Sequence, residues 1–379
     1  TVGGTTRQAT YVSGSGSSAL LFRYTLQSGD SDSDGIAVGS LDASGGTLRD
    51  SAGNDATLTL NSVGSTTSVL IDAVVPTVAS VTVPANATYI ASQNLDFTVN
   101  FNENITVNTT GGTPQLSLTL GATARQATYV SGSGSSALLF RYTVQSGEAD
   151  SDGIAVGTLS ANSGTLRDSA ANNATLTLNS VGSTSSVLVD AVAPTVSSVT
   201  APANGTYIGG QNLDFTVNFT ENMTVNTAGG TPQLSLTVGG TARQATYVSG
   251  SGSSALLFRY TVQSGEVDSD GIAVGTLSAN GGSVRDSVTN DATLTLNNVG
   301  ATSSILVDAF APTVSSVSVP SNGTYITGQN LDFTVNFTES MTVNTAGGTP
   351  QLSLTVGGTT RQATYVSGSG SSALLFRYT

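Results

Sequence analysis

The chain has 379 residues, a formal net charge of −13 at pH 7, and no His, Cys or Trp; all 11 of its basic side chains are Arg. These absences exclude imidazole bases, thiolate nucleophiles, disulfides and zinc sites built from His and Cys. The acidic balance argues against nucleic acid as a partner, and no apolar run approaches the roughly 18 residues of a membrane-spanning helix, so no membrane insertion is expected in this segment.

One string of 19 residues occurs four times. Arg7, Arg125, Arg243 and Arg361 each open the sequence RQATYVSGSGSSALLFRYT, at a constant spacing of 118 positions (125 − 7, 243 − 125 and 361 − 243). A fixed period without insertions indicates one folding unit repeated in tandem, and 118 residues is the size of an independent domain rather than of a short solenoid repeat.

Apolar residues alternate with polar ones along most of each repeat, which predicts half-buried strands and no helix. In Leu213–Phe219, for example, Asp214, Thr216 and Asn218 fall on one face and four apolar residues on the other. The strands expected in one repeat are, in chain order, Leu213–Phe219, Gln233–Val238, Ala242–Val248, Ala255–Val262, Ile272–Leu277, Ala292–Leu296, Ile305–Val307 and, opening the next repeat, Val314–Val319.

Short strands separated by Gly, Ser, Asn and Pro turns predict an all-β fold. We expect tandem immunoglobulin-like β-sandwich domains in an extended array, with a closed barrel as the alternative architecture. Pro76, Pro194 and Pro312 follow short apolar strands and mark the boundaries, because Pro cannot continue a strand ladder. The expected domains are a partial repeat at 1–75, complete repeats at 76–193 and 194–311, and a partial repeat at 312–379.

An acidic loop recurs in the same phase of each repeat. It reads Asp30-Ser-Asp32-Ser-Asp34-Gly35 and returns as Glu148 to Gly153 and as Glu266 to Gly271. Carboxylates at alternate positions before a Gly suit the oxygen shell that Ca²⁺ requires, although the loop is not an EF-hand. The expected strand directions bring these loops to the domain junctions, beside the linker Asp and the Glu that follows the second strand. The predicted Ca²⁺ ligands are Asp30, Asp32, Asp34, Asp72, Glu103, Glu148, Asp150, Asp152, Asp190, Glu221, Glu266, Asp268, Asp270, Asp308 and Glu339.

A plainer interpretation remains for these acids, since Asp, Ser and Gly are also ordinary turn residues. Two further groups are weaker candidates. The stretch from Asp168 to Asn172 is a second acidic turn, repeated at Asp50 and Asp286. The other group lies at the start of the second strand and has two interpretations, as outer metal ligands or as solvent-facing strand residues. Its members are Asp96, Asp214 and Asp332.

These motifs resemble a known family. The stretches from Thr195 to Val199 and from Gly210 to Glu221, the Asp-Ser-Asp-Gly loop, and Arg285 to Asn290 are similar to the bacterial Ig-like repeats found in tandem in giant secreted adhesins of the biofilm-associated and RTX type. The resemblance covers the whole chain. It implies an extracellular, cell-surface stalk that contacts neighbouring repeats of its own chain and is stiffened by Ca²⁺ at the domain junctions.

Two other functions compete with the spacer. An enzyme is disfavoured because the same acids recur in every repeat without a distinctive pocket, so no residue is predicted to be catalytic. A self-assembling extracellular fibre is the second alternative, in which like subunits complete the partial repeats at 1–75 and 312–379 end to end. The simpler interpretation of these partial repeats is that the sequence is a window on a longer protein.

Overall fold

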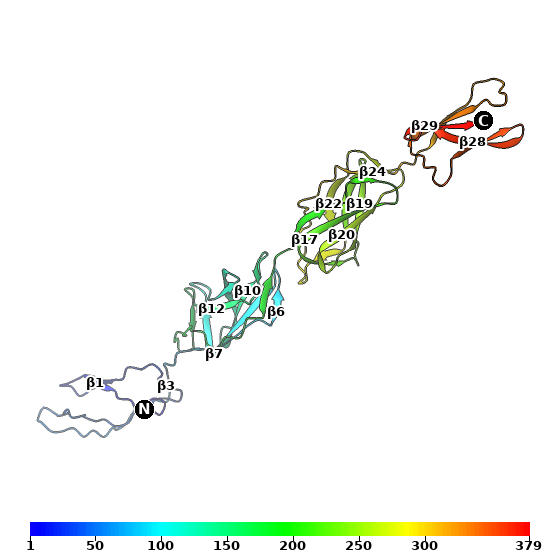
Figure 1. Ribbon diagram of the computed structural model, residues 1–379. Helices are drawn as coiled ribbons and strands as arrows, with labels where there is room; N and C mark the ends of the chain where they lie inside the picture. Colours follow the sequence, from blue (N-terminus) through cyan, green and yellow to red (C-terminus); the bar gives the residue numbers. More distant parts are fainter. The chain divides into compact units, whose positions relative to one another are not determined.

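The computed structural model describes all residues, 1–379, and consists of strands joined by turns, with no helix (Figure 1). It therefore has no helix long and apolar enough to span a membrane. The chain divides into two compact units. The first unit comprises Thr1–Ala193 with Val288–Asn290, and the second comprises Pro194–Ser287 with Asp291–Thr379.

The first unit begins with four short strands at Thr10–Ser13 (β1), Leu21–Arg23 (β2), Ser31–Asp32 (β3) and Ile71–Asp72 (β4). Its later strands are Val78–Thr82 (β5), Ala87–Tyr89 (β6), Asn94–Asn108 (β7), Gln115–Leu120 (β8), Thr123–Ser131 (β9), Ser135–Thr143 (β10), Ala149–Asp150 (β11), Ala155–Ser160 (β12), Thr165–Arg167 (β13) and Val187–Asp190 (β14).

Residues 76–193 form two sheets. The larger has seven strands in the order β12-β8-β9-β10-β7-β13, with β5 also paired to β7, and all of its pairings are antiparallel. The smaller has the order β11-β14-β6, in which β14 and β6 run parallel. β7 pairs with β10 along one side and with β5 and then β13 along the other.

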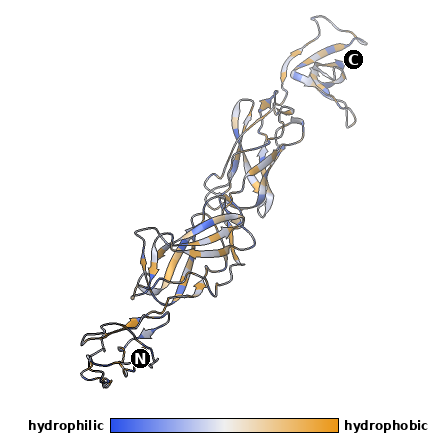
Figure 2. Ribbon diagram, turned by 90° about the vertical axis from the view of Figure 1, so that its left-hand side faces the viewer, coloured by the Kyte–Doolittle hydropathy of each residue, from blue (hydrophilic) through white to orange (hydrophobic).

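The period-2 pattern decides which side chains are buried. Leu95, Phe97 and Val99 on β7 are fully buried, as are Leu138 and Phe140 on the neighbouring β10. Figure 2 shows the same alternation as bands of opposite hydropathy along the strands. At roughly 25 cal/mol per Å² of apolar surface, a buried Phe or Leu contributes about 1.5–3 kcal/mol relative to an exposed one, so this face holds the sheet together.

The second unit repeats this arrangement in residues 194–311. Its strands there are Val196–Thr200 (β15), Gly205–Tyr207 (β16), Asn212–Asn226 (β17), Gln233–Val238 (β18), Thr241–Ser249 (β19), Ser253–Thr261 (β20), Val267–Asp268 (β21), Ala273–Ser278 (β22), Ser283–Arg285 (β23) and Ile305–Asp308 (β24). The larger sheet has the order β15-β17-β20-β19-β18-β22 with β23 on β17, and the smaller has the order β16-β24-β21.

Residues 312–379 of the second unit form one five-stranded sheet in the order β25-β26-β29-β28-β27. Its strands are Val314–Ser318 (β25), Leu331–Met341 (β26), Gln351–Val356 (β27), Thr359–Ser367 (β28) and Ser371–Tyr378 (β29). This sheet has a small core of its own, in which Val335, Ala363, Leu374 and Phe376 are buried.

The expected inward faces are confirmed. Leu256, Phe258, Tyr260 and Val262 are buried, whereas Arg259 between them is not. The expected strand Gln233–Val238 also matches β18 at both ends.

Two sequence predictions about elements need correction, and three short strands were missed. Ala292–Leu296 is not a strand. Its only β-pairing is an isolated parallel bridge between Thr293 and Thr195. The second strand does not end at Phe219, since β17 continues to Asn226 and includes Glu221. Short strands at β16, β21 and β23 were not expected, since two or three residues carry no readable alternation.

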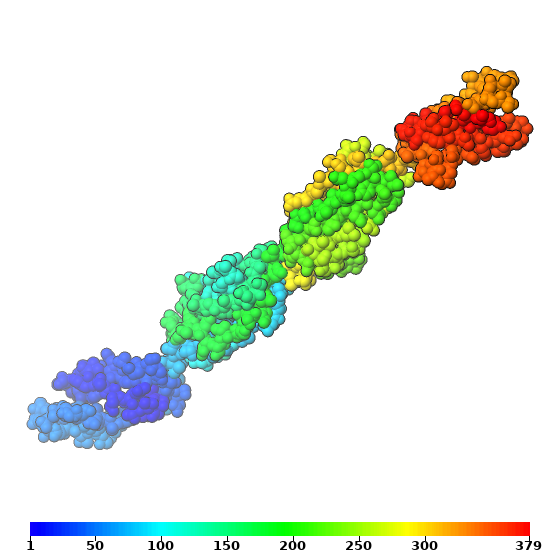
Figure 3. Space-filling model, viewed as in Figure 1, coloured from blue at the N-terminus to red at the C-terminus, as the bar shows by residue number.

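Residues 36–70 contain no strand, although their counterparts 155–160 form β12 and 165–167 form β13. Those two strands pair with β8 and β7; of the corresponding partner positions, residues 1–75 contain only Thr1 and Val2, the counterparts of Thr119 and Leu120 in β8. A cleft of about 740 Å³ lies between the segments that contain Tyr11 and Leu48 (Figure 3).

Candidate metal centre

Glu103 is positioned by an irregularity in β7. On β10, Ala137 pairs with Asn100 and Ser135 pairs with Ile105, so the ladder skips several residues of β7 around Glu103. In the skipped stretch, the Asn102 amide donates instead to the carbonyl of Thr77, the residue before β5, at 3.0 Å. Bulges of this kind bend a strand and redirect its side chains. Beyond the bulge, β7 pairs with β13.

Asp168 follows β13 directly, and Arg167 of that strand pairs with Thr106 of β7. This register brings Asp168 to the bulge that carries Glu103. Asp168 is 5% exposed, and its carboxylate is held by Asn172, whose backbone amide donates to Oδ1 at 2.8 Å and whose side-chain Nδ2 donates to Oδ2 at 2.7 Å. The same Nδ2 donates to the Asp72 carbonyl at 3.0 Å, which ties the turn to the linker.

Asp72 completes the group. It ends β4 and begins the linker that leads to Pro76. One carboxylate oxygen from each of Asp72, Glu103 and Asp168 lies within 4.8 Å of the others. The three residues come from a linker, a strand bulge and a turn that are distant in sequence, and together they could hold a metal ion. We call them the first-unit cluster.

The electrostatics of this cluster favour a positive charge. Burial raises the pKa of the Glu103 carboxyl, and the nearby charges of Asp168 and Asp72 raise it further. None of these three acids has a Lys neighbour, because the chain contains no Lys. Three convergent carboxylates repel one another, and a bound cation would offset that repulsion.

The structure gives the predicted loop acids a different position. Asp32 is buried, and its two oxygens accept backbone hydrogen bonds from Gly3 at 2.6 Å and Gly35 at 2.8 Å. Asp150 does the same with Gly121 and Gly153. These bonds close the loop and fix its contact with a neighbouring hairpin. Neither residue belongs to the first-unit cluster, and the loop acids Asp34, Asp152 and Asp270 are exposed.

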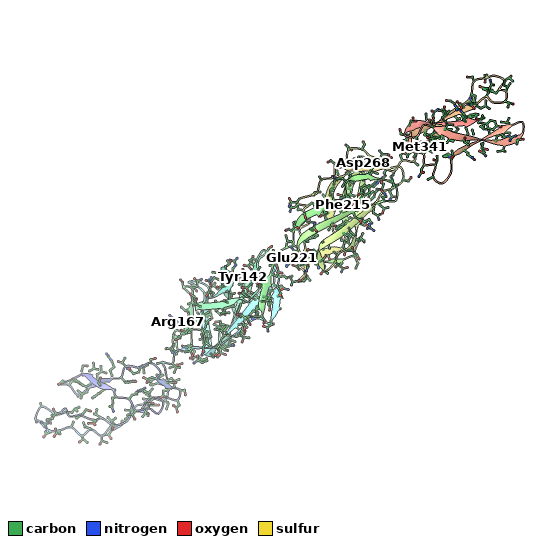
Figure 4. The ribbon with its side chains drawn as sticks, in the orientation of Figure 1. Tyr142, Arg167, Phe215, Glu221, Asp268 and Met341 are labelled. Carbon is green, nitrogen blue, oxygen red and sulfur yellow. The ribbon has the colours of Figure 1, made fainter.

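The first acid of each loop is also held by protein groups. Glu148 is buried; Arg125 Nε and the Tyr142 hydroxyl (Figure 4) both donate to its Oε1, the hydroxyl at 2.6 Å, and the Gln145 amide donates to Oε2 at 2.8 Å. The same set recurs as Glu266 with Arg243 and Tyr260, and as Asp30 with Arg7 and Tyr24.

Burial by itself raises the pKa of the Glu148 carboxyl, but the hydrogen bonds from Tyr142, Gln145 and Arg125 outweigh it and leave that pKa below the ordinary value. Burial, together with the bond to Glu148, raises the pKa of Tyr142 to about 12. The group is therefore an ionised carboxylate held by a neutral phenol and a guanidinium. The sequence did not predict the Arg and Tyr partners, although both lie at inward or flanking positions of the strands in the repeated string.

The remaining predicted acids divide by unit. In the second unit, Asp268, Asp308 and Glu339 line one cleft of about 470 Å³ together with Phe310. Glu221 lies within β17 as Glu103 lies within β7, and Asp286 follows β23 as Asp168 follows β13. In the first unit, the Asp190 carbonyl accepts a hydrogen bond from Asn290 Nδ2 at 2.9 Å, as the Asp72 carbonyl does from Asn172.

Asp96 makes a bidentate ion pair across neighbouring strands, with Arg141 Nε at 2.6 Å and Nη2 at 2.7 Å. Asp214 pairs with Arg259, and Asp332 with Arg377, in the same way. These aspartates are partly exposed strand residues, and their oxygens are engaged by guanidinium groups.

No protein-family model matches the chain, and no curated protein matches it. Among solved structures, a marsupial T cell receptor is similar over 79% of this chain and 92% of its own, with 10% identity and a TM-score of 0.20. A DUF4785 family protein from Legionella pneumophila is similar over 56% of this chain and 53% of its own, with 12% identity and a TM-score of 0.17. The alpha-2-macroglobulin of E. coli covers 78% of this chain and 20% of its own, with 9% identity and a TM-score of 0.14.

Proposed function

We propose that the chain is a structural spacer: tandem immunoglobulin-like β-sandwich domains of an extracellular bacterial surface protein, joined by short linkers that Ca²⁺ stiffens. The observation that carries this proposal is the first-unit cluster, in which the linker residue Asp72 shares a site with Glu103 and Asp168 of the following repeat. A cation bound there would tie the linker to the domain that it enters.

The donor set favours Ca²⁺ over other metals. Every side chain in the cluster is an oxygen ligand, and the chain has no His or Cys, the side chains that zinc and copper prefer. Ca²⁺ accepts six to eight oxygens at about 2.3–2.6 Å, so water and backbone carbonyls would complete a shell begun by three carboxylates. The smaller Mg²⁺ demands a more regular octahedron and keeps more of its water.

A mechanical role also fits what the chain lacks. The same acids recur in each repeat, the charged partners Glu148 and Asp96 are engaged by Arg, and the chain has no His or Cys for acid-base or nucleophilic chemistry. The linkers are a few residues long and contain Pro, so they limit bending more than Gly and Ser linkers do. We therefore assign the function to length and stiffness rather than to catalysis.

Calorimetric titration of the whole chain with CaCl₂ tests the proposal. We expect saturable binding, and we expect the Asp72→Asn variant to lose one site while the remaining heat is unchanged. Small-angle scattering of the wild type with and without chelator should show a change in the maximum dimension. The absence of both Ca²⁺ heat and a scattering response would overturn the spacer function.

A second candidate is a self-assembling fibre. Val130 of β9 and Val248 of β19 are each 47% exposed, and a segment of another copy would cover such apolar strand positions. Sedimentation over a range of concentrations separates the candidates: concentration-dependent chains of subunits favour the fibre, and a constant monomer favours the spacer.

A further inference from the structure

The hairpin turn after β22 differs chemically between repeats although its backbone is the same. It reads Ala279-Asn280-Gly281-Gly282 in the second unit, Ala161-Asn162-Ser163-Gly164 in the complete repeat of the first unit, and Ala43-Ser44-Gly45-Gly46 near the N-terminus. In each copy the fourth residue's amide donates to the first residue's carbonyl, at 2.9, 2.8 and 2.8 Å respectively.

Both central residues of each turn have a positive φ. Asn280 and Gly281 have φ values of 49° and 82°, and Asn162 and Ser163 have 47° and 66°. These values are typical of the tight hairpin turn that favours Asn-Gly. The Asn side chains also match, because Asn280 Nδ2 donates to the Thr231 carbonyl at 3.1 Å and Asn162 Nδ2 donates to the Thr113 carbonyl at 3.0 Å. The two turns therefore differ chiefly in the residue that follows Asn.

We propose that Asn280 is a site of spontaneous deamidation, and that the other Asn-Gly pair of the same repeat, Asn204-Gly205, is protected by the fold. Gly281 has no Cβ to shield its backbone nitrogen, and that nitrogen makes no hydrogen bond, in an exposed turn. The Gly205 amide, in contrast, donates to the Ser304 carbonyl at 2.9 Å within the parallel pair of β16 and β24.

The chemistry requires only water. The Gly281 nitrogen loses its proton and attacks Cγ of Asn280; the N–Cγ bond forms, the Cγ–Nδ2 bond breaks, and ammonia leaves with the proton. Water then adds to either carbonyl of the resulting succinimide, which opens to aspartate or to isoaspartate. No electrons are transferred. A hydrogen bond to Ser304 opposes the first step at Gly205, because the amide proton is held by an acceptor and the nitrogen is fixed in the strand pair.

The product alters the turn. A carboxylate at position 280 cannot donate to the Thr231 carbonyl as the amide does, and isoaspartate adds one backbone carbon to a tight turn. This turn leads into β23, which ends next to Asp286, the counterpart of Asp168 in the first-unit cluster. Deamidation would therefore add a negative charge and loosen the hairpin that precedes a candidate metal ligand.

Peptide mapping of the intact chain gives a matched comparison. Cleavage after Arg yields Tyr142–Arg167 and Tyr260–Arg285, and each peptide contains a single Asn, at the corresponding turn. The folded chain is incubated in mildly alkaline buffer and then digested. We expect the Asn of the second peptide to be converted to Asp or isoaspartate several-fold faster than the Asn of the first. Labelling by an isoaspartyl methyltransferase should identify part of the product as isoaspartate.

Two variants copy turns that the chain already contains. Gly281→Ser reproduces the Asn162-Ser163 pair and should slow deamidation to the rate at Asn162, and Asn280→Ser reproduces the Ser44-Gly45 pair and should abolish it. Deamidation at Asn204, identified from fragment masses, should be slow in the folded chain. In denaturant, Asn204 and Asn280 should deamidate at equal rates. Equal rates for the two turn peptides, or equal rates for Asn204 and Asn280 in the folded chain, would overturn the proposal.

Discussion

At the scale of single residues, acids that look alike in the sequence have opposite environments in the structure. Glu148 is buried but receives donors on both oxygens, so its ionised form is stabilised. Glu103 is less buried but faces two other carboxylates, so its ionised form is disfavoured. Burial alone would raise both pKa values, and the partners decide the sign of the shift.

Glu148→Gln should lower stability and flatten its dependence on acid pH. Folding lowers the pKa of Glu148 from its ordinary value of 4.5. Its contribution to the free energy of unfolding is therefore fully present above pH 4.5 and is lost as the pH falls through the lower pKa of the folded state. Thermal midpoints measured at neutral and acid pH test this. We expect the wild type to lose stability more steeply in acid than the variant, whereas parallel curves would contradict the assigned role.

Glu103→Gln should have the opposite effect in the absence of metal. Because the pKa of Glu103 is raised, the folded state favours the protonated form, and stability is lost as the pH rises through the folded pKa. With chelator at neutral pH the variant should therefore melt above the wild type, and it should lose most of the Ca²⁺-induced rise in melting temperature. Asp34→Asn, which removes an exposed acid outside the cluster, should leave that rise intact. A Glu103→Gln variant that keeps the full Ca²⁺ response would exclude Glu103 as a ligand.

At the scale of elements, the conformation of the acidic loop depends on its glycine. Gly153 has a φ of 101°, and a Cβ there would lie 2.5 Å from the Ser185 Cα. The Asp150 carboxylate accepts a hydrogen bond from the Gly153 amide, which closes the loop next to Ser185, just before β14. The Gly in the Asp-Ser-Asp-Gly motif is thus required by backbone conformation and by close packing.

Gly153→Ala should destabilise its repeat by about 1–3 kcal/mol or more, because the strained backbone and the steric clash act together. Gly147→Ala is the matched control, since Gly147 has a φ of 85° but no atom near the added Cβ, so only the backbone term applies. Chemical denaturation of both variants gives the comparison. Equal losses would mean that the contact with Ser185 is relieved by a small shift.

At the scale of the whole molecule, residues 76–193 and 194–311 each have a separate core. Phe97 and Phe140 belong to one cluster of buried residues, and Phe215 (Figure 4) and Phe258 belong to another. No residue is shared between the clusters, so each repeat has the apolar surface that it needs to fold as a unit.

Phe140→Ala should therefore lower the stability of its own repeat by about 3–5 kcal/mol, through lost burial and the cavity that remains. Differential scanning calorimetry of the whole chain should show one transition moving down while another keeps its position. Phe258→Ala should move the other transition. A single transition that shifts as a whole in both variants would show that the repeats unfold together.

The sequence by itself determined the all-β class, the inward faces of the long strands and the repeat of 118 residues, because alternation and repetition are local patterns. Asp72 and Glu103 were also among the ligands predicted from it. Only the tertiary structure decided which acids meet. The sequence predicted the loop acids as metal ligands too. In the structure the carboxylates of Asp32 and Asp150 accept hydrogen bonds from backbone amides, whereas the bulge in β7 and the pairing of β13 bring Glu103 and Asp168 to the linker residue Asp72. A carboxylate's role depends on the donors that surround it, and those donors come from strands far away in the chain.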